Sequence, residues 1–533
     1  MLKTYSYPRF PYEVSEEQRS GRAQRHPVVV VGAGPIGLTA ALDLAYRGIA
    51  CVVIDDNDTV SLGSRAVCYA KRPLEIFDRL GCAGPMLEKG ISWKLGKVFH
   101  RDKLSYQFDL QPEPAHRMPG MINLQQYYLE EFLVAQCQRT PLIALRWKHR
   151  LVGLSQHADH VALQVETPEG CFEMQAEWLL ACDGANSDTR AMVGAAFAGQ
   201  AFQDRFLIAD VVMQADFPAE RWFWFDPPFH PGQSVLLHKQ ADHVWRIDFQ
   251  LGWDADPEQE KQPGRVVPRI QAMLGPERPF ELEWVSVYQF ACRRIDRLRH
   301  GRVLFAGDAA HQVSPFGARG ANTGVQDVDN LAWKLALVLR GEAPETLLDS
   351  YDEERSVAAD DSLLNSTRST DFITPKSAAS RLYRDAVLEL AQDNPMIRPL
   401  VNSGRLSRPT PYLASSLNTP DTDSFASRMA PGTNCDDAPI MVAGQPGWLL
   451  HRLGRGFTLL SFGAAEPVRH GAVTAQPLVV GRDIEDAEGL LAARYDARPG
   501  TTYLIRPDQH VAARWRRFDA AAIRQALARA IAA

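Results

Sequence analysis

The run VVVVGAGPIG at residues 28–37 constrains the fold of this chain more than any other feature. Four consecutive valines predict a strand that is buried on both faces of a parallel sheet. Gly32, Gly34 and Gly37 follow at G-x-G-x-x-G spacing, which is typical of a tight turn into a helix whose first residues approach a pyrophosphate. A second apolar run ends at Asp55, where a carboxylate can accept hydrogen bonds from an adenosine ribose. The sequence therefore predicts a Rossmann-like unit that binds a dinucleotide.

A second segment, GRVLFAGDAAHQVSPFGARGANTGVQDVDNL at residues 301–331, indicates which dinucleotide binds. Taken alone, the first unit suits either a nicotinamide or a flavin. The second segment reads as a short apolar strand, a Gly-Asp pair, a loop and a long helix, and it resembles the second FAD signature of the class A flavin-dependent aromatic hydroxylases. That resemblance implies that Asp308 binds the ribityl chain of FAD. It also places a loop and a helix N-terminus against the isoalloxazine ring, through Pro315, Gly320, Ala321 and Asn322.

A third match to the same family is WLLACDGANSDTR at residues 178–190. In the family, a strand that ends in Asp-Gly and is followed by Ser and Arg lines the dinucleotide cleft. The matching residues are Asp183, Gly184, Ser187 and Arg190. By position, Arg65 is similar to an arginine that contacts the pyrophosphate, and Gln126 to a glutamine near the FAD, a role for which Gln125 competes.

Composition limits the other classes of function. A chain of 533 residues with 45% hydrophobic content predicts two or three domains. The net charge of −6 and the lack of a long basic stretch argue against nucleic acid as a partner. The eight cysteines show neither C-x-x-C nor metal-ligand spacing, so no metal is expected, and Cys51, Cys171 and Cys182 are interpreted as buried reduced thiols. With no secretory or membrane-spanning run at the N-terminus, a cytoplasmic protein is expected.

The predicted fold class is α/β, with an inserted antiparallel sheet and a separate C-terminal domain. An N-terminal arm is expected at 1–25, and the Rossmann-like FAD-binding domain at 26–400. Alternating apolar and polar residues predict a substrate-binding sheet inserted at about 202–292. A Pro-rich linker is expected at 401–446. Residues 447–533 resemble the thioredoxin-like C-terminal domain of larger family members, but the absence of C-x-x-C favours a structural or dimer-supporting role.

Five aromatic residues of the inserted sheet are candidates to line a substrate pocket, although strand aromatics more commonly pack a core. They are Trp222, Phe223, Trp224, Phe225 and Trp245.

The candidate catalytic residue is Arg246, which resembles a strand arginine that approaches the flavin in the family. A solvent-facing position is the alternative. For His311, a role in holding the loop is favoured over proton transfer. His238, His243 and Tyr288 are possible proton relays on chemical grounds alone.

The resemblance implies a reaction. NADH or NADPH reduces FAD, O2 reacts to give a flavin C4a-hydroperoxide, and one oxygen atom passes to a phenolic or related electron-rich ring. A small aromatic substrate and a possible homodimer are therefore expected. Baeyer–Villiger insertion and a polycyclic substrate are alternatives, as is a flavin-binding scaffold or sensor without turnover.

Overall fold

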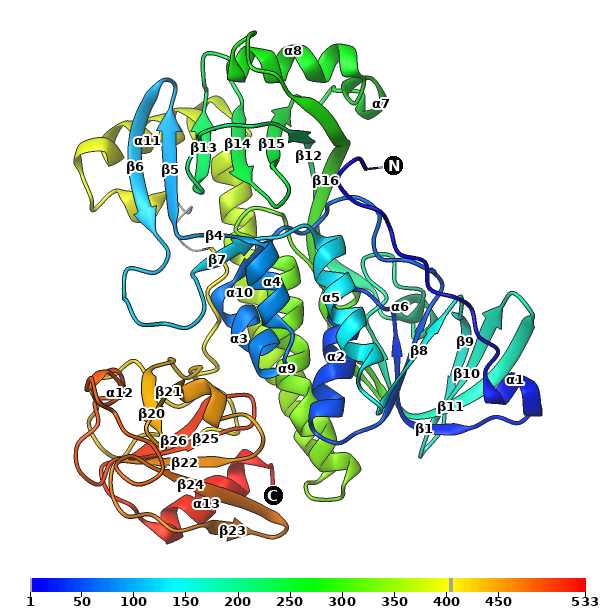
Figure 1. Ribbon diagram of the computed structural model, residues 1–533, viewed down its shortest axis with the longest axis vertical. Coiled ribbons are helices and arrows are strands. Elements are labelled where there is room, and N and C mark those ends of the chain that lie inside the picture. The colour runs from blue at the N-terminus through cyan, green and yellow to red at the C-terminus, as the bar shows by residue number, and fades with distance from the viewer. Residues whose placement is uncertain (1, 402–405) are drawn as a thin grey trace.

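The computed structural model describes residues 2–401 and 406–533. Figure 1 shows a parallel-sheet domain, an antiparallel sheet above it and a C-terminal domain below. The long helices α9 (Gly320–Leu339) and α10 (Asp349–Ile373) run through the middle of the molecule between these parts. The α/β fold class expected from the sequence is confirmed.

The parallel sheet is built around the four-valine strand. In spatial order its main strands are β17 (Arg299–His300), β18 (Val303–Phe305), β11 (Gly170–Ala181), β1 (Arg25–Val31), β2 (Cys51–Asp55) and β8 (Ile143–Trp147), and the hairpin of β9 (Arg150–Gln156) and β10 (Val161–Thr167) extends β11. Strand β1 pairs in parallel with β11 on one side and β2 on the other. Its valines are at most 7% exposed, because both faces of the sheet are covered.

A layer of mutually packed helices covers one face of this sheet. They include α2 (Pro35–Tyr46), α3 (Lys71–Arg79), α4 (Ala83–Lys89), α5 (Gln126–Gln138) and α9. Helix α2 begins directly after β1, with Gly34 as its N-cap and Pro35 in its first turn, where the missing N–H is no loss.

The antiparallel sheet draws on more of the chain than the expected insertion. In spatial order it contains β19 (His311–Gln312), β16 (Glu281–Ile295), β12 (Phe197–Val212), β15 (Val244–Leu251), β14 (Ser234–Lys239), β13 (Arg221–Phe225), β5 (Leu95–His100) and β6 (Lys103–Asp109). Helix α8 (Pro263–Leu274) packs on its outer face through Val266 and Ile270. The inner face looks toward the parallel-sheet domain (Figure 1).

Strand alternation sorts the five candidate aromatics onto opposite faces. Phe223 and Phe225 lie on the inner face. Trp222, Trp224 and Trp245 belong to the hydrophobic cluster under α8, so they do not line the inner face. The aromatic run predicted both sets, but only the tertiary structure shows which set faces inward.

The C-terminal domain has a mixed sheet of β23 (Val468–His470), β24 (Val473–Val479), β22 (Thr458–Ser461), β25 (Thr502–Ile505) and β26 (Val511–Trp515). Strands β22 and β24 are parallel, β22 and β25 antiparallel, and α13 (Ala520–Ala530) packs on the sheet. The thioredoxin-like assignment stays a prediction.

The expected linker at 401–446 differs from an extended connection. Its residues 402–405 lie outside the described residues. Strand β20 (Pro439–Val442) pairs with β21 (Gln445–Trp448), and Cys435 and Ala438 are fully buried in the C-terminal core. This Pro-rich segment joins the domain because its spaced apolar side chains fold back onto the sheet.

Two smaller expectations have mixed outcomes. The N-terminal arm packs on the surface, with Tyr5 stacked on Tyr127 at 4.1 Å between ring centroids. Cys51 and Cys182 are buried as expected, but Cys171 is exposed because it lies beside the β10–β11 turn.

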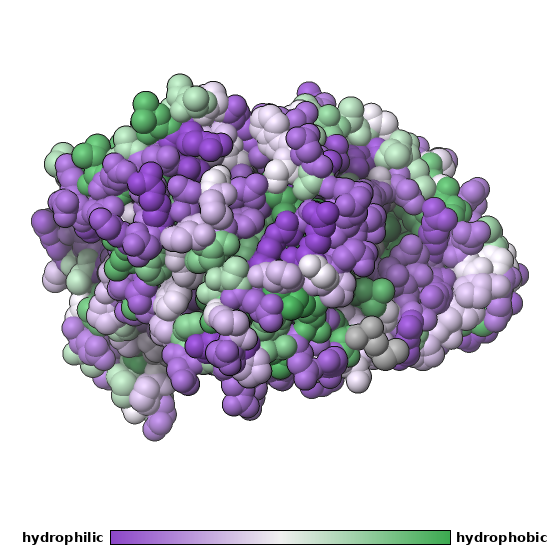
Figure 2. Space-filling view, turned by 90° about the horizontal axis from the view of Figure 1, so that it is seen from above, coloured by the Kyte–Doolittle hydropathy of each residue, from purple (hydrophilic) through white to green (hydrophobic). Residues whose placement is uncertain are grey.

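None of the helices in the described residues combines the length and apolarity that a bilayer crossing requires. Seen from above, the molecule is mostly hydrophilic, with hydrophobic residues in scattered groups (Figure 2).

Candidate active site

The three sequence motifs meet at the carboxyl ends of β1, β11 and β18. A Cβ atom on Gly32 would lie 2.6 Å from the Cys182 carbonyl oxygen, so the first and third motifs are in backbone contact. A Cβ on Gly307 would lie 2.8 Å from Ile36 Cγ1, in the first turn of α2. These close approaches require glycine, and they form one site from segments that are far apart in the chain.

The N-terminus of α9 completes this site. A Cβ on Gly320 would lie 3.9 Å from Asp308 Oδ1, so the aspartate stands over the first turn of the helix. Asn322 fixes that turn, since its Oδ1 accepts the Ala70 N–H at 2.8 Å and its Nδ2 donates to the Ala318 carbonyl at 2.6 Å. Ala321, between Gly320 and Asn322 in the chain, is half-buried.

The loop before α9 turns sharply at an exposed proline. The Ala318 N–H donates to the Pro315 carbonyl at 3.1 Å. Gly317 and Ala318 both have positive φ, of 100° and 52°. This conformation turns the chain toward the inner face of the antiparallel sheet, where Phe316 is buried.

The first motif leaves space where a phosphate would lie. A Cβ on Gly34 would meet nothing within 4 Å, although Gly34 is the N-cap of α2. A helix N-terminus with open space before it suits an anion. Asp55 lies nearby with its carboxylate oriented, because Oδ2 accepts the Ala33 N–H at 2.6 Å and Oδ1 accepts the Asn57 N–H at 2.8 Å. Burial raises the pKa of Asp55.

Asp308 lies at the carboxyl end of β18, beside the first turn of α9. Its side chain is exposed to solvent, yet the surrounding protein raises its pKa, an effect that His311 and Arg65 oppose. Tyr288 is in the same situation, since burial and Asp308 raise its pKa while 46% of its surface remains accessible. The exposed Arg65 is therefore close to both residues, with its guanidinium available to a ligand.

Gln126 acts on the Arg65 loop. Its Oε1 accepts the Ala66 N–H at 3.0 Å, and its Nε2 donates to Glu130 Oε1 at 2.8 Å. Gln125 is fully buried, and its Nε2 donates to the Ala241 carbonyl at 3.2 Å.

Asp183 binds residues that follow it closely in the chain. Its carboxylate accepts the Ser187 hydroxyl at 2.6 Å and the Thr189 N–H at 3.0 Å, at the start of α6 (Asp188–Met192). Arg190, on that helix, donates to the Ala309 carbonyl at 3.2 Å and so joins the third motif to the second.

Arg246 is buried rather than solvent-facing. It binds Asp210 in a bidentate pair of 2.8 and 2.9 Å, and it donates to the carbonyls of Ser64 and Arg65. Burial lowers the pKa of Arg246, but Asp210 more than offsets this effect. The side chain thus ties the Arg65 loop to the sheet.

Among the other candidates, His311 holds the loop through the side chain of Asp327. Its Nε2 lies 2.7 Å from Asp327 Oδ2, and the same oxygen accepts the Gly307 N–H at 2.9 Å. His238 is buried and His243 lies exposed in a turn.

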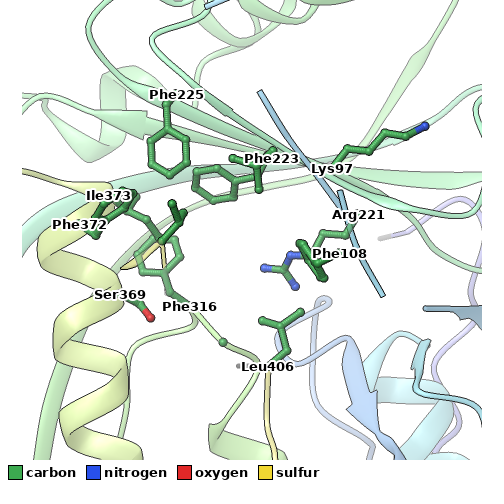
Figure 3. A pocket seen from close by; sticks show the side chains of 13 residues that line it. Lys97, Phe108, Arg221, Phe223, Phe225, Phe316, Ser369, Phe372, Ile373 and Leu406 are labelled. Carbon is green, nitrogen blue, oxygen red and sulfur yellow. The ribbon is translucent and has the colours of Figure 1, made fainter. Parts of the chain in front are cut away.

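A cavity of about 50 Å³ adjoins the Phe316 loop (Figure 3). Its apolar side chains come from the antiparallel sheet, from α10 and from segments beside them: Val98, Phe108, Phe223, Phe225, Phe316, Phe372, Ile373, Val401 and Leu406. A mostly apolar, aromatic lining with a few polar side chains is typical of small-molecule sites.

Arg221 is one of the lining residues that sequence reasoning missed. The signal available was the alternation that places Arg221, Phe223 and Phe225 on one face of a strand.

Comparisons with known proteins agree with this geometry. A family described as FAD binding domain matches residues 25–366. The 6-methylpretetramide 4-monooxygenase of Streptomyces rimosus is 32% identical, over 92% of this chain and 91% of the relative. The 3-(3-hydroxy-phenyl)propionate/3-hydroxycinnamic acid hydroxylase of Mycolicibacterium smegmatis is 26% identical, over 91% and 90% respectively.

One solved structure covers almost the whole fold. The flavin-dependent monooxygenase PieE, solved with FAD and substrate, has a TM-score of 0.82 at 22% identity and covers 95% of this chain and 99% of its own. At that identity the likeness shows the fold alone. The family match and the relative at 32% identity confirm the FAD cofactor and the enzyme class expected from the sequence. The chain belongs to the FAD-binding domain family, as one of its flavin-dependent aromatic monooxygenases.

Proposed function

We propose that this enzyme uses NADH or NADPH and O2 to hydroxylate a phenolic compound that binds in the aromatic cavity. One observation carries the proposal. Phe316 and Gly317 line the cavity and belong to the loop expected to contact the isoalloxazine ring. A substrate ring among the phenylalanines would therefore lie beside the reactive part of the flavin.

The proposed FAD site lies at the carboxyl ends of β1, β11 and β18, where the three motifs meet. The N-terminus of α2 at Gly34 would receive the pyrophosphate with help from Arg65, and Asp55 would accept the ribose hydroxyls. When bound, the flavin supplies hydride acceptance and oxygen transfer.

The other residues of this site act on the flavin end. Asp308 would bind the ribityl chain, since it is solvent-accessible beside the first turn of α9. The N–H groups of Ala321 and Asn322, at the positive end of α9, would stabilise negative charge on the pyrimidine edge. We assign positioning roles to Gln126, Asp183 and Arg246, whose polar atoms bind protein groups.

The protein contributes a dry, aromatic environment for the substrate. Phe225 and Phe316 are 2% and 6% exposed, so water is largely excluded. O2 as co-substrate and assembly as a homodimer belong to the same proposal. A cytoplasmic location fits the eight unpaired cysteines, because reducing compartments keep thiols free.

The test is turnover with a panel of phenols, hydroxybenzoates, hydroxyphenyl-alkanoates, a cyclic ketone and a polycyclic phenol. NADH and NADPH oxidation, oxygen uptake and product mass are measured. A phenol that accelerates oxidation and gains one oxygen atom supports the proposal. An ester product from the ketone alone supports Baeyer–Villiger insertion, and bound FAD without stimulated oxidation supports a scaffold or sensor.

A further inference from the structure

The N-terminal arm begins with an irregular segment, residues 2–14, that crosses from the antiparallel sheet to the parallel sheet (Figure 1). Near its start, Glu283 of β16 accepts the Thr4 N–H at 2.8 Å and the Thr4 hydroxyl at 2.6 Å. Further along, Phe10 stacks on Trp147 of β8, with 4.4 Å between ring centroids. The arm is therefore anchored on both sheets.

Between these anchors the arm binds the loop that carries Arg65. The Tyr7 hydroxyl accepts the Gly63 N–H at 2.8 Å. Farther back in the same loop, the Asp58 carbonyl accepts the Phe10 N–H at 2.8 Å. Gly63 lies two residues before Arg65, in the loop that follows β2. The arm thus fixes the loop close to the residue proposed to meet the pyrophosphate.

Gly63 adopts a conformation that favours glycine. Its φ is 75°, in the left-handed region. A Cβ at this position would lie 2.7 Å from the indole nitrogen of Trp284 on β16. The loop therefore contacts the arm and β16 at the same residue, and it has little room to move toward the sheet.

Aromatic packing holds Tyr7 itself in place. Its ring lies edge-on to Tyr5 at 5.0 Å and to Tyr127 at 6.0 Å between centroids. Burial raises the pKa of Tyr7, so the phenol stays neutral and its oxygen remains an acceptor for the Gly63 N–H. Because the neighbouring rings restrict the side chain, the hydroxyl is held at a fixed position.

The backbone on both sides of Arg65 is also held by the protein. Arg246 donates to the carbonyls of Ser64 and Arg65, and Gln126 accepts the Ala66 N–H at 3.0 Å. The Arg65 side chain, in contrast, is exposed. The position of its guanidinium therefore depends on how firmly the loop backbone is fixed.

We infer that Tyr7 is a positioning residue of the FAD site, which acts through the Gly63 N–H to hold Arg65 where it meets the pyrophosphate. A guanidinium binds a phosphate more tightly when it is held in place beforehand, because less conformational freedom is lost on binding. Without the hydroxyl, the Gly63 N–H loses its acceptor and the loop gains freedom. This inference rests on the proposed function and adds the N-terminal arm to its FAD site.

The test is a double-mutant cycle on FAD affinity with Tyr7→Phe and Arg65→Gln. The FAD-loaded full-length chain is diluted, and the rise in flavin fluorescence as FAD dissociates gives Kd. Tyr7→Phe should weaken binding about three- to tenfold, as for one hydrogen bond. Arg65→Gln should weaken it about 10- to 100-fold, as for a charge-assisted hydrogen bond. In the Arg65→Gln background, Tyr7→Phe should change Kd by less than about twofold, because the hydroxyl acts through Arg65.

Tyr12→Phe is the matched control, since it removes a hydroxyl from the same arm at a point away from the loop. The Tyr12 hydroxyl accepts Gln18 Nε2 at 2.9 Å and donates to Thr167 Oγ1 at 3.3 Å. This variant should leave Kd for FAD unchanged. An unchanged Kd in Tyr7→Phe overturns the inference, as does an equal loss in Tyr12→Phe. An effect of Tyr7→Phe that is undiminished in the Arg65→Gln background also overturns it, because the arm would then act on the fold alone.

The two proposals fail in different ways. If Arg65→Gln leaves FAD affinity unchanged, the role of Arg65 and the inference both fall. If Arg65→Gln weakens FAD binding and Tyr7→Phe does not, the FAD site stands and the role of Tyr7 falls. If the cycle shows the expected coupling but no aromatic compound is hydroxylated, the proposed function falls and the role of Tyr7 in FAD binding remains.

Discussion

Buried arginines occur in two contrasting settings in this molecule. Arg506, in the C-terminal domain, is fully buried and binds two carboxylates, Glu354 at 2.9 Å and Asp508 at 2.5 Å. Arg221, in the cavity, is nearly as buried but donates to the Cys68 thiol. The first charge is compensated by carboxylates in direct contact, whereas the second contacts a thiol and has the buried Asp248 carboxyl only in its vicinity. Burial of a charge therefore does not indicate its role until its partners are known.

The compensated setting also connects domains. Arg355, next to Glu354 on α10, donates to Asp327 at 2.6 Å, and Asp327 accepts the Gly307 N–H at 2.9 Å. This chain of buried contacts runs from the C-terminal domain to the turn that carries Asp308. The C-terminal domain thus supports the geometry of the proposed flavin site.

The largest expected effect is the loss of stability when the buried cation Arg506 is removed from its two carboxylates. Arg506→Met leaves Asp508 and Glu354 short of a buried cation, so the free energy of unfolding should fall by about 3–5 kcal/mol. Thermal and denaturant unfolding of the FAD-loaded enzyme measure this. Arg482→Gln, at an exposed ion pair with Asp483, is the control and should leave the melting temperature unchanged. An equal melting temperature for Arg506→Met and wild type would contradict the comparison.

Two glycines of the first motif differ in the same way, since one is enclosed by protein and the other faces open space. A Cβ on Gly37 would lie 1.9 Å from the Gly32 carbonyl oxygen, whereas a Cβ on Gly34 meets open space. Gly37→Ala should therefore impair folding. Gly34→Val should fold but lose about 100-fold in FAD affinity, worth about 2.7 kcal/mol, because the side chain fills the phosphate position. Equilibrium titration of the apoprotein with FAD measures this, and undiminished affinity would refute the assignment.

The two faces of β13 provide a smaller test. Phe223→Ala removes a cavity wall and should raise the KM for a phenolic substrate about tenfold, with a smaller change in kcat. Trp224→Phe, on the outer face and stacked on Phe99, should leave KM within about twofold of the wild type. Steady-state kinetics decide, and the reverse pattern would show that the faces are wrongly assigned.

The smallest expected effect concerns Asp248 near Arg221. Its folded pKa is about 6, above the value of about 3.9 in an unfolded chain. The folded state therefore holds the proton longer, and the carboxyl costs stability as pH rises through this window. Asp248→Asn should be more stable than wild type by about 1 kcal/mol at pH 8, with a smaller gain at pH 5.

Unfolding at both pH values measures this gain, with the exposed Asp254→Asn as the control. Loss of stability in Asp248→Asn at pH 8 would show that the carboxylate compensates Arg221 after all.

The sequence predicted those parts of the fold and the site that are determined by residues adjacent in the chain. The glycines of 28–37 and Asp308 were identifiable because tight turns and strand ends follow local rules. Arg221 was not, because its surroundings include Cys68, which accepts a hydrogen bond from it and lies 153 residues away in the chain. The inward face of the strand that begins at Arg221 was equally hidden, since alternation gives two faces but not their direction. The packing of Cys435 and Ala438 in the C-terminal core was hidden as well, because the buried residues of this segment have no regular period.

The most direct test of the central claim, that oxygen is inserted into an aromatic compound bound in this cavity, is turnover of 3-(3-hydroxyphenyl)propionate under isotopically labelled O2. The FAD-loaded wild type and Phe223→Ala are compared by mass spectrometry of the products. We expect the wild type to give a product heavier by one labelled oxygen atom, and Phe223→Ala to give less of it at the same NAD(P)H consumption. NAD(P)H oxidation that yields only hydrogen peroxide, with this acid and with the whole panel of phenols, would contradict the claim.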